Sequence, residues 1–230
     1  MEDGAGPLLF YWTVFQSTFS IPDWKSVFYD WQVFLPAALT AYLLGSIPFG
    51  LLLAKASGLG DIRKIGSGNI GATNVLRTGN KKLAAATLLL DMAKGFVAVF
   101  LSWQYFGPDV TFFSALATVI GHLFPIWLKF KGGKGVASSL GVLLGLSWAV
   151  GVACLLSWLT IALVFRYSSL AALVSIAAAP VFGWYLGDPQ VAGAAIFLAI
   201  LVWIRHAANI RRLLRGEESR IKLKRTGSTS

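Results

Sequence analysis

The chain has 230 residues, of which 56% are hydrophobic and 13% are charged, and its mean hydropathy is +0.68. Soluble domains carry about 25% charged residues, so this composition excludes an ordinary soluble protein and predicts a polytopic membrane protein. The net charge of +10 does not indicate nucleic-acid binding, because the 20 Lys and Arg residues gather at the ends of apolar segments. The only cysteine, Cys154, lies in an apolar run, which excludes a disulfide framework and a thiolate metal cluster.

Apolar runs and polar loops alternate along the chain. Residues 1–32 are rich in aromatic side chains and predict an external segment in the headgroup region. Residues 206–230 predict a basic cytoplasmic segment. A membrane helix needs about 20 apolar residues, or fewer when it is buried among others. The predicted spans are 33–54, 83–103, 111–128, 169–187 and 190–204.

Residues 136–165 form 30 uncharged, apolar positions, too many for one upright helix. The stretch GLSWAVG, from Gly145 to Gly151, offers a turn between two short helices. With both counted, the sequence predicts an all-α bundle of seven transmembrane helices over 33–205. Its N-terminus is then outside and its C-terminus cytoplasmic, which places 18 of the 20 Lys and Arg residues on the cytoplasmic side.

The first long cytoplasmic loop, 57–82, contains the stretch GSGNIGATN. Successive glycines expose backbone N–H groups that make a concave anion site, and a helix that starts just after them adds its positive end. An arginine nearby can offer a planar fork to a phosphate. The alternative is a simple polar turn. The candidate ligands are Ser67, Gly68, Asn69, Gly71, Thr73, Asn74 and Arg77.

The second cytoplasmic loop, 129–138, contains FKGGKG, with two lysines around two glycines at a predicted helix start. Ammonium groups beside free backbone donors are typical of a phosphate site. It is not a Walker A loop, because a glycine follows the second lysine. The alternative is interfacial lysines that meet lipid headgroups. The candidate phosphate ligands are Lys131, Gly132, Gly133, Lys134 and Gly135.

Five more polar residues stand in or beside the apolar runs. His206 and Asn209 are three positions apart, so on a helix they share a face and can point back at the loops. Asp91 and Lys94 have the same spacing inside a span, where mutual neutralisation and a supporting role are expected, the alternative being a direct contact of Lys94 with substrate. His122, near the cytoplasmic end of its span, is expected to support the site.

The cytoplasmic face carries only Asp61, Glu217 and Glu218 as carboxylates, too few for a two-metal hydrolase. No zinc spacing, dinucleotide fingerprint or G-x-S-x-G elbow is present. We therefore expect chemistry on anionic substrates that uses no metal and no cofactor.

Five stretches together resemble a known family. They are AYLLGSIPFG, DIRKIGSGNIGATNVLRTG, LLLDMAKG, GHLFPIWLKFKGGKGVA and RHAANIRRLLRGEE, between Ala41 and Glu218. The family is that of the bacterial integral-membrane glycerol-3-phosphate acyltransferases that use acyl phosphate as donor. The resemblance implies transfer of a fatty acyl group to the sn-1 hydroxyl, which gives lysophosphatidic acid and phosphate, in the bacterial inner membrane with the active site on the cytoplasmic side.

By motif position, the resemblance implies that Ser67 and Arg77 are the essential serine and arginine and that FKGGKG is the phosphate loop. His206 and Asn209 correspond to the essential histidine and asparagine, and Glu217 to a glutamate that maintains structural integrity. The proton acceptor stays open between His206 and a substrate phosphate oxygen. The substrates, acyl phosphate and glycerol 3-phosphate, and the lipid bilayer are the expected partners, and the chain is compatible with a monomer.

Two other functions are compatible with a basic, glycine-rich cytoplasmic face. A phosphate transporter shares anion-binding loops, but transporters usually have internal repeats and a site near the midplane, and no repeat is present here. A protein that only binds lipid headgroups would explain the charge but not the Asn, Ser and Thr among the glycines.

Overall fold

The computed structural model describes residues 7–221, and every element in that range is a helix. The lysines and arginines of the tail from residue 222, which the topology prediction counts, lie outside this range. Within the described range, five helical spans are long and apolar enough to cross a membrane. They are Trp31–Ala56, which contains α3 (Trp31–Gly45) and α4 (Phe49–Ala56), then α6 (Lys81–Phe106), α7 (Pro108–Leu123, with its span running on to Leu128), α9 (Trp148–Phe165) and α10 (Ser168–Leu186).

Two further apolar helices complete the bundle. α8 (Val136–Leu146) has only 11 residues. α11 (Pro189–Arg205) and α12 (Ala207–Leu214) count as one further span only if they are taken together across a bend of 65°. The all-helical architecture is thus confirmed for residues 7–221, with five or six helices that could cross a membrane, while the count of seven crossings and the inside–outside orientation stay predictions.

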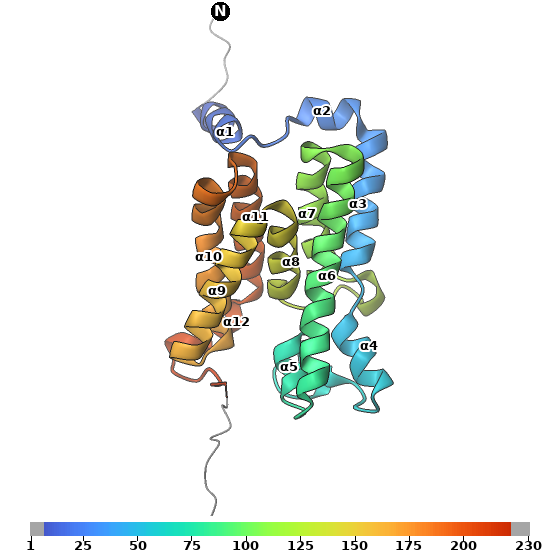
Figure 1. Ribbon diagram of the computed structural model, residues 1–230, viewed down its shortest axis with the longest axis vertical. Coiled ribbons are helices and arrows are strands. Elements are labelled where there is room, and N and C mark those ends of the chain that lie inside the picture. Colours follow the sequence, from blue (N-terminus) through green and yellow to red (C-terminus); the bar gives the residue numbers. More distant parts are fainter. Residues whose placement is uncertain (1–6, 222–230) are drawn as a thin grey trace, which may run out of the picture.

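The predicted break within 136–165 is present. α8 ends at Leu146 and α9 begins at Trp148, with Ser147 between them in an extended conformation (φ −154°, ψ 115°). The two helices therefore run back on each other, and α8 is the short helix at the centre of the bundle (Figure 1).

The span predicted over 33–54 is present but broken, which the hydropathy pattern did not show. α3 stops at Gly45 and α4 begins at Phe49. Pro48 causes the break, since proline has no N–H and disfavours helical geometry in the residue before it. The backbone carbonyl of Ile47 has no i+4 helical partner and accepts hydrogen bonds from the amide of Phe49 (3.1 Å) and from the ammonium of Lys94 (2.8 Å).

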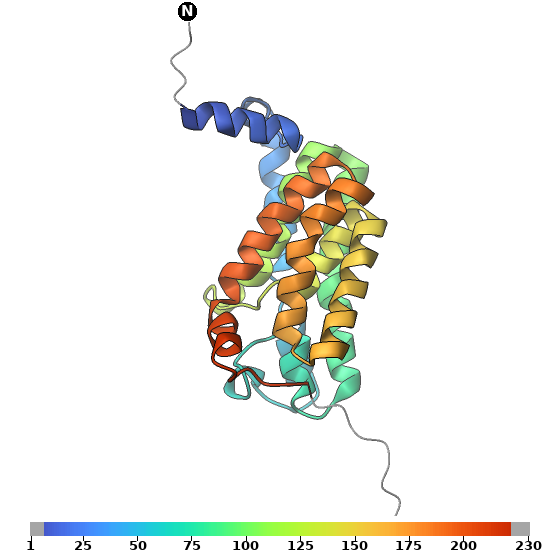
Figure 2. The same ribbon diagram turned by 90° about the vertical axis from the view of Figure 1, so that its left-hand side faces the viewer.

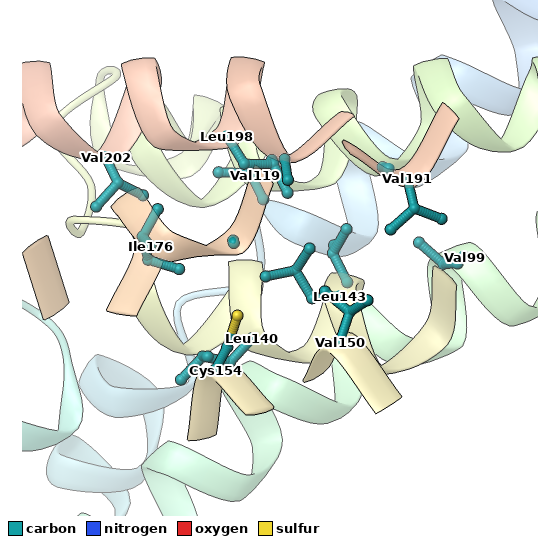
Figure 3. Close-up of a cluster of buried hydrophobic side chains, with 14 of the residues drawn as sticks. Val99, Val119, Leu140, Leu143, Val150, Cys154, Ile176, Val191, Leu198 and Val202 are labelled. Atoms are coloured by element: carbon teal, nitrogen blue, oxygen red, sulfur yellow. The ribbon is translucent and has the colours of Figure 1, made fainter. Parts of the chain in front are cut away.

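The apolar core lies among α6, α7, α8, α9, α10 and α11 (Figure 3). Val119, Leu143 and Leu198 are fully buried there. Small residues let the helices approach closely: a β-carbon on Gly95 of α6 would collide with Ser138 of α8, and one on Gly141 would collide with Met92. Because α6 and α8 touch backbone to backbone, their polar residues are held in fixed relative positions.

α1 (Pro7–Thr18) and α2 (Trp24–Tyr29) lie across one end of the bundle (Figures 1 and 2). The ring of Phe19 packs on Trp184 of α10, with 5.7 Å between ring centroids. α4, α5 (Ala72–Leu76) and α12 lie at the opposite end (Figure 1). The chain thus separates its aromatic N-terminal segment from its glycine-rich loops by the length of the bundle.

Candidate active site

A cavity of about 1040 Å³ is the central feature of the end that carries the loops. One part has an apolar wall from α6, α8 and α9, formed by Leu88, Val136, Leu140, Leu155, Leu156, Trp158 and Leu159. The polar residues that line the rest of the cavity are Ser67, Asn69, Thr73, Arg77, Lys81, Asp91, His122, Lys134, Ser168, Ser169, His206, Asn209, Glu218, Ser219 and Arg220. The glycine loop, the FKGGKG loop and the C-terminal segment therefore meet at one cavity, with a cationic part beside an apolar one.

The side chain of Asn74 holds the glycine loop in place through hydrogen bonds to its backbone. Its side-chain nitrogen donates to the carbonyls of Ile62 (2.7 Å) and Ile65 (3.2 Å), and its oxygen accepts from the amide of Ser67 (3.1 Å). It is fully buried and does not line the cavity, and neither does Gly68. Ile62 and Val75 are buried beside it. Asn74 thus holds the loop so that other residues reach the cavity.

Of the residues singled out in this loop, the cavity is lined by Ser67, Asn69, Gly71, Thr73 and Arg77. The guanidinium of Arg77 donates to the hydroxyl of Ser219 across 2.6 Å, and the hydroxyl of Thr73 lies 3.1 Å from that of Ser168. The glycine loop is therefore tied to the C-terminal segment and to the start of α10.

The FKGGKG loop differs from the sequence expectation. The amides of Gly132 and Gly133 are not free to bind an anion, because they donate to the carbonyls of Leu123 and His122. Their own carbonyls accept from Arg205. These glycines allow close packing, since a β-carbon on Gly133 would collide with the ring of His122.

Of the two lysines in the FKGGKG stretch, the structure brings only Lys134 to the cavity, together with Gly135, whereas Lys131 is exposed to solvent. Burial, followed by the nearby positive charges of Arg212, Arg77 and Arg205, lowers the pKa of the Lys134 ammonium group to about 8, although Glu218 opposes the shift. Near neutral pH the group is charged, so it can bind an anion.

His206 stands at the bend between α11 and α12 and is 2% exposed. Its Nδ1 lies 2.8 Å from the carbonyl of Val202. A carbonyl only accepts hydrogen bonds, so Nδ1 carries the proton and Nε2 is the acceptor of the neutral ring. Burial lowers the pKa of His206 to about 4, against an opposing effect of the Val202 carbonyl. At neutral pH the ring therefore offers one acceptor.

Asn209 joins the FKGGKG loop to the C-terminal segment. Its oxygen accepts from the ammonium of Lys134 (2.6 Å), and its nitrogen donates to Glu218 (2.7 Å). Glu218 also accepts from Arg212 (2.6 Å) and from the hydroxyl of Ser169 (2.9 Å). Burial alone would raise the pKa of the Glu218 carboxyl, but these hydrogen bonds outweigh it and hold that pKa below its usual range.

The network uses Glu218, whereas the exposed side chain of Glu217 takes no part in it. Sequence reasoning singled out Glu217 and missed Glu218, Ser219 and Ser169. The adjacent carboxylates are indistinguishable in sequence, and only the turn after α12 decides which one faces inward. No sequence pattern indicates a role for Ser169 or Ser219, because serine is common at helix starts and in terminal segments.

Asp91, Lys94 and His122 form a buried polar cluster. The ammonium of Lys94 lies 2.9 Å from the Asp91 carboxylate, 2.9 Å from Nδ1 of His122 and 2.8 Å from the carbonyl of Ile47. Asp91 and His122 also line the cavity, whereas Lys94 does not. The structure therefore contains the expected ion pair between Asp91 and Lys94, and His122 is hydrogen-bonded to Lys94.

The sequence model of the family described as glycerol-3-phosphate acyltransferase matches residues 35–216. The chain belongs to this family. A glycerol-3-phosphate acyltransferase of Mesorhizobium japonicum is 57% identical over 188 residues, covering 82% of this chain and 96% of that protein. One of Paramagnetospirillum magneticum is 58% identical over 185 residues, covering 80% and 92%.

The fold of this chain is similar to that of two crystal structures of PlsY (YgiH), an integral membrane glycerol 3-phosphate acyltransferase. The glycerol 3-phosphate form has a TM-score of 0.78 and 43% identity, covering 82% of this chain and 96% of that one. The lysophosphatidic acid form has a TM-score of 0.77 and 42% identity, covering 82% and 95%. The family match begins at residue 35 and ends at residue 216, so α1, α2 and Glu218 lie outside it, whereas the partners of Glu218, namely Ser169, Asn209 and Arg212, lie within it.

Proposed function

We propose that this chain transfers a fatty acyl group from acyl phosphate to the sn-1 hydroxyl of glycerol 3-phosphate, giving 1-acyl-glycerol 3-phosphate and phosphate. The observation that carries the proposal is a single cavity with cationic groups beside an apolar wall. Arg77 and Lys134 suit the phosphate groups of two anionic reactants, and the leucines of α6 and α9 suit the fatty chain.

Acyl phosphate is a mixed anhydride with a good leaving group, so positioning and charge stabilisation can supply much of the rate. In the proposed step, the hydroxyl oxygen bonds to the acyl carbon and the bond from that carbon to the phosphate oxygen breaks. The phosphate leaves with the electron pair. The hydroxyl proton passes to Nε2 of His206 or to a phosphate oxygen, so the charges balance in either case.

We further propose that Ser67 and Asn209 bind glycerol 3-phosphate and that the reaction takes place at the cytoplasmic face of the bacterial inner membrane in a monomer with seven crossings. The loops gather at one end of the bundle, which supports a one-sided site (Figure 1). A membrane-impermeant maleimide tests the orientation with Asn80→Cys in a Cys154→Ala background. Labelling of inverted vesicles but not of intact cells is expected, and the reverse pattern would overturn the orientation.

The reaction is tested with the purified chain in detergent, palmitoyl phosphate and glycerol 3-phosphate. We expect release of phosphate and formation of lysophosphatidic acid in equal amounts, and no product with palmitoyl-CoA as the only donor. Turnover without a closed vesicle would exclude transport as the explanation. Binding of both ligands without turnover would instead favour a lipid-headgroup-binding protein.

A further inference from the structure

His122 is a second histidine of the cavity, and the proposed reaction gives it no task. Its environment fixes its protonation. Lys94 is 1% exposed in its side chain and has three close neighbours, the carbonyl of Ile47, the Asp91 carboxylate and Nδ1 of His122. An ammonium group has three donors and no acceptor. Because the carboxylate favours the charged lysine, Lys94 donates to His122, and Nδ1 must carry a lone pair.

The proton of the neutral His122 ring is therefore on Nε2. This nitrogen lies against Gly133, since a β-carbon added to Gly133 would overlap with it. The amide of Gly133 also donates to the main-chain carbonyl of His122 across 3.0 Å. The next residue, Lys134, lines the cavity, and so does His122. The structure thus holds an N–H donor in the cavity wall, beside the lysine of the FKGGKG loop.

The two histidines are held in opposite tautomers. At His206, a carbonyl acceptor forces the proton onto Nδ1 and leaves Nε2 as an acceptor. At His122, the lysine donor forces the proton onto Nε2 and makes it a donor. One imidazole can accept a proton from a hydroxyl group, whereas the other can only give a hydrogen bond to an oxygen that accepts.

We propose that the Nε2–H group of His122 donates a hydrogen bond to an oxygen of the acyl phosphate, either on its carbonyl or on its phosphate. The inference rests on the proposed function. Acyl phosphate presents only acceptor oxygens at its reacting end, and negative charge grows on them as the hydroxyl group attacks and as phosphate leaves. A donor in fixed orientation stabilises this charge without reorganisation. Asp91 and Lys94 act through His122 and are positioning residues.

Two variants separate the donor from the structural contacts of His122. His122→Asn keeps an acceptor where Nδ1 faces Lys94 but removes the donor at Nε2. His122→Gln places an amide N–H near the Nε2 position. The measurements are kcat and KM for palmitoyl phosphate and for glycerol 3-phosphate, together with the melting temperature. We expect His122→Asn to lower kcat/KM for palmitoyl phosphate about 10- to 100-fold, with KM for glycerol 3-phosphate and the melting temperature unchanged. His122→Gln is expected to recover about tenfold of that loss.

The proposal is overturned if His122→Asn retains the kcat/KM of the parent chain. It is also overturned if both variants lose activity equally in parallel with their melting temperatures, because His122 would then only hold the fold. A binding measurement keeps the inference separate from the proposed reaction. A non-hydrolysable acyl phosphonate should bind the parent chain more tightly than His122→Asn even if palmitoyl phosphate is never turned over, in which case only the proposed reaction fails.

Discussion

Lys134 and Asn209 are 75 positions apart in the chain, yet the lysine ammonium donates to the asparagine oxygen across 2.6 Å. This hydrogen bond joins the FKGGKG loop to α12, and Glu218 holds the other end of the asparagine amide. The ammonium therefore has a fixed direction, with further N–H donors available to an anion.

Lys134→Met should reduce kcat/KM for glycerol 3-phosphate or acyl phosphate at least about 100-fold, because a charged hydrogen bond to a phosphate is lost. Lys131→Met is the matched control from the same loop, since its side chain is exposed and outside the cavity. Steady-state kinetics of both variants would check this. Equal losses in the two variants would show that charge near the loop matters and that the specific contact does not.

The pKa of Lys134, lowered to about 8, predicts a basic limb in the pH profile. The cation is present below that pKa and is lost as the pH rises through it, so kcat/KM should fall above a pH of about 8. Arginine keeps its charge throughout this range. In Lys134→Arg the limb should disappear, even if the maximal rate is lower. A limb that persists in the arginine variant would assign it to another group.

His206 should contribute only an acidic limb. Its pKa of about 4 means that the ring is neutral at pH 7 and loses its Nε2 acceptor as the pH falls through that value. If Nε2 accepts the hydroxyl proton, His206→Gln should lower kcat/KM by about 100-fold or more and remove the acidic limb. The full pH profiles of both proteins are the measurement. A modest loss with an unchanged profile would leave a substrate phosphate oxygen as the acceptor.

Glu218→Gln removes the charge that Arg212, Asn209 and Ser169 share. The expected cost is about 1–3 kcal/mol, which corresponds to a fall of about 2–12 °C in melting temperature for a chain of this size. Activity should fall as well, because Asn209 loses its anchor. Glu217→Gln, next to it and exposed, should resemble the parent chain. Indistinguishable melting curves for the two variants would contradict the network.

Phe19→Ala tests the N-terminal helices. The ring contact with Trp184 is worth about 0.5–1.5 kcal/mol, so a small fall in melting temperature is expected. kcat and KM should not change, since the contact lies at the end of the bundle away from the cavity (Figure 1). Phe28→Ala, with 77% of the residue exposed, is the control. A change in KM with an unchanged melting temperature would contradict this prediction and show that the N-terminal helices affect substrate binding in the cavity.

Sequence alone could predict the parts of this fold that depend on apolar length. The positions of the long helices and the break between α8 and α9 follow from the length of the apolar runs and from where the charges fall. The break at Pro48 went unnoticed, because the run of apolar residues continues through it and hydropathy does not register a missing N–H. Its effect, a carbonyl of Ile47 that accepts from Lys94, depends on a residue 47 positions away.

The site could be predicted by residue type but not by orientation. Arg77, Lys134, His206 and Asn209 line one cavity, as their chemistry suggested. Which of two neighbouring lysines or glutamates faces inward depends on turn geometry, which has no signature in composition. The same holds for Gly132 and Gly133, whose amides bind main-chain carbonyls only because α7 ends beside them.

Arg77 of the glycine loop and Lys134 of the FKGGKG loop are both hydrogen-bonded to residues after α11, namely Ser219 and Asn209, and Asn209 is held in turn by Glu218. A ribosome produces these partners last, after the preceding helices have entered the membrane. During synthesis, Arg77 and Lys134 are therefore present before Ser219 and Asn209, to which they are hydrogen-bonded in the complete chain. The contacts that orient both cations are therefore complete only once the segment after the 65° bend has folded back against the two loops.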